Sequence, residues 1–105
     1  MQTYIKKDYR GNWRASTEVA VDDSRVATIT TSKSSYGLLT THASVGKRDG
    51  NFISHMMFQD YSKTVKSSQP KRVTEKLVSA QHDEVLADID WVLDDIKAFY
   101  SLETA

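Results

Sequence analysis

Every segment of this chain with the periodicity of a β-strand precedes the one long segment with the periodicity of an α-helix. The stretch WRASTEVAV, residues 13–21, alternates so that Trp13, Ala15, Thr17, Val19 and Val21 share one side. This period of two is typical of a strand with one buried face. The β-branched stretch RVATITTSK and the stretch LLTTHASVG follow, separated by the turn signals DDS and SSYG. Because no helix is interleaved with these strands, the order predicts an α+β fold with an antiparallel sheet.

The dipeptide Asp49-Gly50 predicts the turn of a β-hairpin, because both residue types tolerate the positive φ that such turns use. A two-residue turn would pair Arg48 with Asn51, Ala43 with Met56 and Thr41 with Phe58. A bulged three-residue turn would instead pair Val45 with Ile53, and the sequence leaves this choice open. The segment QTYIKKDY, residues 2–9, can add an edge strand, which gives four to five strands over about residues 1–68.

The only proline, Pro70, marks the end of the sheet region. At 100° per residue, one apolar arc holds Val85, Ile89, Val92, Leu93, Ile96, Phe99 and Tyr100. We therefore expect one long C-terminal amphipathic helix, within a helical region of about 71–101, to pack on the sheet in a single domain, 1–105. Val73 and Leu77 fall outside the arc, which predicts a separate short turn of helix or a bend near Ser79–Gln81.

The formal net charge of zero hides a division along the chain. Residues 1–76 hold 13 lysines and arginines against 7 aspartates and glutamates, whereas residues 77–105 hold Lys97 alone against 7 acidic residues. The two parts therefore carry formal charges of +6 and −6. Such a division indicates a polyanionic partner for the basic part, or a monomer in which the two parts attract each other.

Composition also bears on location and chemistry. The chain has no cysteine, which fits a reducing compartment, and no apolar run of membrane-spanning length. We expect a cytoplasmic protein without membrane contact. Motifs of phosphate-binding loops, zinc proteases and serine hydrolases are absent, so we expect no enzyme activity, no catalytic residue and no cofactor. His42 and His55 would share a face in one hairpin register, but a third metal ligand, from Asp60 or His82, is not evident, and we expect no metal site.

Basic and aromatic residues are interleaved through the first three-quarters of the chain. Lysine and arginine side chains contact phosphates, and tyrosine rings stack on unpaired bases. The expected nucleic-acid-binding residues are Lys33, Tyr36, Lys47, Arg48, Tyr61, Lys63, Lys66, Lys71 and Arg72. The leading hypothesis is a small, non-enzymatic accessory or regulatory protein that binds single-stranded DNA or RNA on a basic sheet.

The outer face of the predicted helix supports an alternative hypothesis. Trp91 lies among the acidic residues Asp88, Asp94 and Asp95 on the helical wheel, and tryptophan is enriched at the energetic centres of interfaces. An acidic helix with an exposed tryptophan is typical of a protein-interaction module, such as an inhibitor or adaptor, or of a homodimer.

Overall fold

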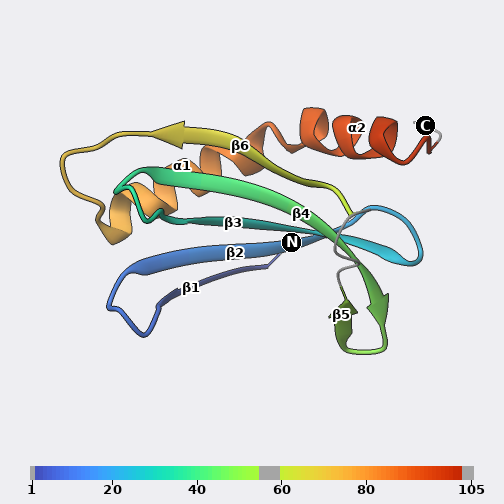
Figure 1. Ribbon diagram of the computed structural model, residues 1–105, viewed down its shortest axis with the longest axis horizontal. Helices are drawn as coiled ribbons and strands as arrows, with labels where there is room; N and C mark the ends of the chain where they lie inside the picture. Colours follow the sequence, from blue (N-terminus) through green and yellow to red (C-terminus); the bar gives the residue numbers. More distant parts are fainter. Residues whose placement is uncertain (1, 55–59, 103–105) are drawn as a thin grey trace.

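The computed structural model describes residues 2–54 and 60–102. One antiparallel sheet carries two helices on one of its faces, which confirms the α+β class (Figure 1). The strands are β1 (Thr3–Lys7), β2 (Trp13–Ala20), β3 (Arg25–Lys33), β4 (Leu39–Asp49), β5 (Phe52–Ser54) and β6 (Ser62–Ser68). The helices are α1 (Glu75–Ala87) and α2 (Ile89–Phe99). Within the described residues, neither helix is long and apolar enough to cross a membrane.

The sheet follows the order of the chain from β1 to β4, and each neighbouring pair is antiparallel. β5 and β6 then share the remaining edge of β4. β6 pairs with its first half, between Leu39 and Ser44, and β5 pairs with its last three residues. The six strands therefore fill five positions across the sheet.

The register of the β4–β5 hairpin differs from both predicted registers. Asp49 pairs with Phe52 and Arg48 with Ile53, so that the two-residue loop is Gly50-Asn51 and Asp49 belongs to β4. Gly50 takes the positive φ of 62°, at the first central position, where a type II′ turn uses glycine. Ala43 and Thr41 lie opposite Lys63 and Lys66 of β6. Their predicted partners Met56 and Phe58, and the candidate metal ligand His55, lie outside the described residues.

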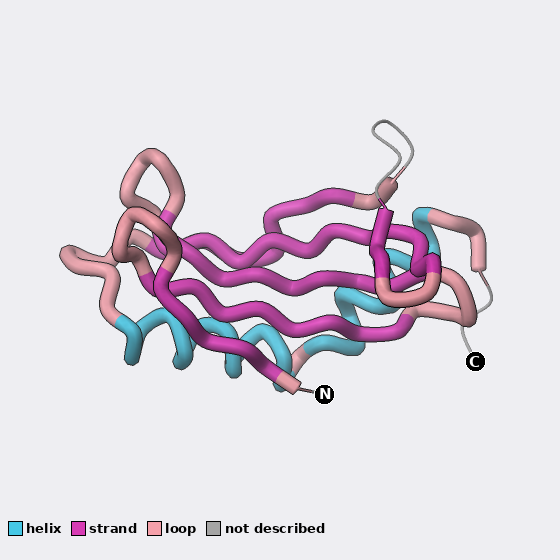
Figure 2. The backbone as a smooth tube through the Cα atoms, turned by 90° about the horizontal axis from the view of Figure 1, so that it is seen from below, coloured by secondary structure: helices cyan, strands magenta, loops and turns pink. Residues whose placement is uncertain are grey.

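The predicted alternation of the strands matches the buried face of the sheet. Ala15, Ala27, Ile29, Ala43 and Val45 are buried beneath the helices. α1 contributes Val78 and Val85, and α2 contributes Val92 and Ile96, all of which are buried. The apolar core therefore lies between one sheet face and the helices, and neither α1 nor α2 lies on the other face (Figure 2).

The prediction of one long helix is wrong, because the helical region is divided into α1 and α2 at Asp88. α1 begins after Thr74, whose side chain accepts a hydrogen bond from the Leu77 N–H at 3.2 Å. No bend occurs near Ser79–Gln81, which lie inside α1. Val85 on α1 and Ile96 on α2 reach the same core cluster, so the break keeps the apolar side of both helices on the curled sheet.

A buried polar seam crosses the sheet beneath α1. It runs from Thr3 through Thr17, His82, Thr31 and Thr41 to Gln81, and each step is a side-chain hydrogen bond of 2.7–3.1 Å. Threonine takes the place of an apolar residue on the buried face of β2, β3 and β4, and the hydrogen bonds of the seam satisfy these buried hydroxyls.

Candidate nucleic-acid interface

Three loops from distant parts of the chain lie at one end of the sheet. They are the β1–β2 loop (8–12), the β3–β4 turn (34–38) and the β6–α1 loop (69–74). The antiparallel pairing brings them together, because Lys7 pairs with Trp13, and Leu39 pairs with both Lys33 and Ser68. Figures 1 and 2 both show these loops on the side of the molecule away from α2.

Cations gather at this end, and we call it the basic end. Its residues are Lys6, Arg10, Arg14, Lys33, Lys71 and Arg72, all of them exposed. The ion pairs between described residues involve other cations. Asp8 is the nearest acidic residue in the sequence to Arg10, and its carboxylate accepts hydrogen bonds from the backbone N–H groups of Arg10 and Asn12, at 2.8 and 3.0 Å. This one carboxylate does not balance six cations, so the basic end has a surplus of positive charge.

Four of the predicted nucleic-acid-binding residues belong to this end. Lys33 ends β3, Tyr36 lies in the β3–β4 turn, and Lys71 and Arg72 lie in the loop before α1. The Tyr36 side chain is 89% exposed, so its ring is open to solvent. These four residues come together although about 40 positions separate the two groups in the sequence.

The other predicted cations lie elsewhere, and three of them are in ion pairs. Lys63 contacts Asp95 at 3.1 Å and Lys66 contacts Glu84 at 2.7 Å, so both join β6 to the helices. Arg48 contacts Glu18 at 2.9 Å. Lys47 is exposed near the far end of β4.

Tyr61 is buried and offers no ring face for stacking on a base. Its side chain is 4% exposed, and its phenol donates a 2.7 Å hydrogen bond to Asp95. Burial and this hydrogen bond both raise the pKa of the Tyr61 phenol. The Tyr61 hydrogen bond, and then Lys63, hold the pKa of the Asp95 carboxyl below its ordinary value. These residues hold β6 against α2 and belong to the structural part of the molecule.

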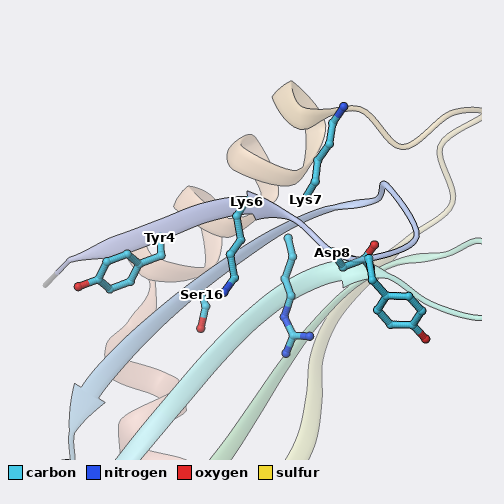
Figure 3. A pocket seen from close by; sticks show the side chains of 7 residues that line it. Tyr4, Lys6, Lys7, Asp8 and Ser16 are labelled. Carbon is cyan, nitrogen blue, oxygen red and sulfur yellow. The ribbon is translucent and has the colours of Figure 1, made fainter.

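A hollow of about 560 Å³, the sheet hollow, opens on the basic end over β1 and β2 (Figure 3). It is lined by Tyr4, Lys6, Lys7, Asp8, Tyr9, Arg14 and Ser16. Lys6 stands opposite Arg14 in the β1–β2 register, and Figure 3 shows Lys7 pointing to the other side of the strand. Like charges directly opposite each other destabilise a strand pair by a few tenths of a kcal/mol. A bound anion would remove that cost.

A second hollow of about 480 Å³, the loop hollow, lies beside the first. It is lined by Asp8, Tyr9, Arg10, Asn12, Lys33, Ser34 and Ser35. Asp8 and Tyr9 line both hollows, so they form the wall between them. The loop hollow is lined by two cations, Arg10 and Lys33. The sheet hollow is lined by three, of which Lys6 and Arg14 stand opposite each other and Lys7 points to the other side of the strand (Figure 3).

Lys6, Tyr9, Arg10 and Arg14 were missing from the predicted site. A signal for Arg14 is present in the sequence, because it alternates with the buried Ala15 and must face away from the helices. The pairing of Arg14 with Lys6, by contrast, depends on the β1–β2 register, which no residue pattern specifies.

The helix-free face of the sheet continues from the sheet hollow as a polar surface. It presents the hydroxyls of Ser16, Thr28, Thr30, Ser32, Thr40, Ser44, Ser62 and Thr64. His42 lies among them, with its Nε2 2.7 Å from the Ser62 hydroxyl. Among the described residues, no three histidine, aspartate or glutamate side chains are placed to hold a metal ion.

The predicted protein interface lies on α2, away from the basic end. Trp91 is 40% exposed, and Asp94 is also exposed one turn further along the helix. Asp88 is the residue between the two helices and is exposed. Asp95 differs from them because Tyr61 and Lys63 already contact its carboxylate.

No protein-family model matches this chain, and neither the curated proteins nor the solved structures contain a significant match to it.

Proposed function

We propose that this protein is a small, non-enzymatic accessory or regulatory protein that binds nucleic acid at its basic end. The observation that carries the proposal is the gathering of Lys6, Arg10, Arg14, Lys33, Lys71 and Arg72 on one end of a molecule whose formal net charge is zero. Such a surface attracts phosphates without regard to base sequence. The lack of cysteine supports a cytoplasmic location as part of the same proposal.

A titration with fluorescent oligonucleotides at 50 and 200 mM salt tests this proposal. We expect binding that weakens as salt rises, because bound phosphates release counterions. The double variant Arg10→Gln/Lys33→Gln should weaken binding and reduce the slope of log affinity against log salt by about 0.7 for a single strand, because these two cations line one hollow and would together neutralise one phosphate there. Both side chains are exposed, so the fold should remain intact.

Lys47→Gln is the matched control, since Lys47 is an exposed cation outside the basic end. It should leave both the affinity and the salt slope unchanged. Absence of binding to any oligonucleotide at the lower salt concentration would overturn the proposal. Equal losses of affinity from Lys47→Gln and from the double variant would show that the charge acts without a defined site.

The second candidate function is a protein-interaction module, including self-association, through the outer face of α2. The exposed Trp91 beside Asp90 and Asp94, neither of which is in an ion pair between described residues, favours it. Sedimentation of the protein over a range of concentrations tests self-association directly. Trp91→Ala should abolish a dimer that uses this face, whereas Arg10→Gln should leave it intact.

A further inference from the structure

The wall that the two hollows of the basic end share is formed by Asp8 and the aromatic residue Tyr9. Tyr9 lines both hollows and is 90% exposed. Arg10, the next residue of the same loop, contacts the Tyr9 ring. The Arg10 guanidinium carbon lies 5.3 Å from the ring centroid, and Arg10 Nε donates a 3.0 Å hydrogen bond to the Tyr9 phenol oxygen. Arg10 therefore steadies the ring, and the high exposure of Tyr9 leaves room for a second flat group.

We propose that the ligand of the basic end is a single strand that crosses Tyr9, with one base stacked on its ring and a phosphate in each adjoining hollow. This inference rests on the proposed function and adds to it the strandedness of the ligand and the residue that selects it. Lys6 and Arg14 meet the phosphate on one side of the stacked base, and Arg10 and Lys33 meet the phosphate on the other side.

Strandedness follows from what the ring requires. A stacked base must present a free face, and the bases of a duplex already stack on their neighbours. A duplex can reach the cations through its phosphates, but it cannot place a base on Tyr9 without unstacking. The Tyr9 ring therefore favours single strands, whereas the cations attract both forms.

The variant Tyr9→Leu tests the role of the ring. Base stacking on one aromatic side chain is worth roughly 1–3 kcal/mol, so the affinity for a single-stranded oligonucleotide should fall by about 5- to 150-fold. The affinity for a duplex of the same length should change less than twofold. Because the Tyr9 side chain is almost fully exposed, the circular dichroism spectrum and the unfolding midpoint should stay unchanged.

Phe52→Leu is the matched control. Phe52 is an aromatic residue of β5, is 80% exposed, and lines neither hollow. It should change single-strand affinity less than twofold. If Tyr9→Leu has no effect, or if Phe52→Leu has an equal effect, the stacking position assigned here is wrong.

The same titrations separate this inference from the function on which it rests. Salt-dependent binding of both ligand forms with equal affinity, unchanged by Tyr9→Leu, would retain nucleic-acid binding and overturn single-strand selection. Failure of every oligonucleotide to bind would overturn both. A decrease in the salt slope of about 0.7 after Lys6→Gln/Arg14→Gln, and a separate decrease of about 0.7 after Arg10→Gln/Lys33→Gln, would support a phosphate in each hollow.

Discussion

At the scale of single residues, the hydrogen bonds of the buried seam determine which nitrogen of His82 carries the proton. The Gln81 amide nitrogen donates to the Leu39 carbonyl and to Thr41, because a backbone carbonyl can only accept. Thr41 must then donate its own proton to Thr31, and Thr31 donates to Nδ1 of His82. Nε2 therefore carries the proton of the neutral ring and donates it to Thr17.

This arrangement predicts that His82 makes the protein less stable in acid. Burial lowers the pKa of His82 below its ordinary value of 6.5, and this effect outweighs the opposing charge of Asp83. A protonated ring would have two donors, and Nδ1 would then face a hydroxyl that is already donating. Below about pH 6.5 the His82 ring is protonated in the unfolded chain but stays neutral in the folded protein. The free energy of unfolding should then fall by up to about 1.4 kcal/mol per pH unit until the folded pKa is reached.

Urea unfolding of the wild type and of His82→Gln between pH 5 and pH 8 measures this effect. The variant should be less stable at pH 8, and its disadvantage should shrink as the pH falls, because a glutamine takes up no proton. His42→Gln is the control, because His42 lies on the helix-free face and contacts Ser62 rather than the seam. A constant difference between wild type and His82→Gln across this range would contradict the prediction.

The tyrosines show what the sequence cannot say about one residue. Tyr9, Tyr36 and Tyr61 all follow or precede strand-like segments beside basic residues, and local pattern does not distinguish them as stacking positions. Tyr61 is buried because α2 folds over it, with the Phe99 ring at 5.6 Å and the Tyr100 hydroxyl accepting from its backbone N–H. These contacts join residues almost 40 positions apart, so the residues around Tyr61 in the sequence do not predict its burial.

At the scale of elements, strand periodicity predicts which face of a strand is buried better than it predicts which residues pair across neighbouring strands. The alternation of residues 13–21 identifies the buried side of β2, where Ala15 and Thr17 are fully buried. The hairpin register was missed because Asp49 remains in the strand and the turn uses Gly50-Asn51. The division at Asp88 was also missed, since neither proline nor glycine interrupts residues 75–99 to mark it.

The β1–β2 pair offers a prediction in which stability and binding move in opposite directions. Lys6→Glu replaces two opposed cations with an opposite-charge pair, Glu beside Arg14. The free energy of unfolding should rise by about 0.5 kcal/mol, because cross-strand pairs of opposite charge contribute roughly 0.2–1 kcal/mol. Affinity for oligonucleotides should fall, since the sheet hollow then has one cation fewer and one anion more. Urea midpoints and fluorescence anisotropy measure the two effects.

Lys47→Glu supplies the comparison for this element. Lys47 stands opposite Arg25 in the β3–β4 register, so the exchange changes the charge of a similar cross-strand pair. It should leave nucleic-acid binding unchanged, because Lys47 lines neither hollow. Loss of stability together with loss of affinity in Lys6→Glu would mean that the substitution disrupts β1. The prediction that the opposed cations lower stability while they serve binding would then be wrong.

At the scale of the whole molecule, some charges of the basic part of the chain form ion pairs with charges of the acidic part. Lys63 and Lys66 pair with Asp95 and Glu84, as expected for two halves that attract each other. The cations of the basic end collect where three loops meet, and the acidic outer face of α2 lies elsewhere (Figure 1). The sequence shows the net charge of each part of the chain. The sheet topology determines which charged side chains form ion pairs and which can contact a ligand.

The fluorescence of the two tryptophans can report separately on the basic end and on the outer face of α2. Trp13 begins β2 beside the β1–β2 loop, with the Lys7 ammonium 5.2 Å from its ring, whereas Trp91 is exposed on α2. In the Trp91→Phe variant, the fluorescence of Trp13 should change when an oligonucleotide is added, because its two neighbours in the chain line the hollows, Asn12 the loop hollow and Arg14 the sheet hollow. In Trp13→Phe, the fluorescence of Trp91 should stay constant, and a saturable response from Trp91 alone would move the ligand to the acidic helix face and end the assignment of the basic end.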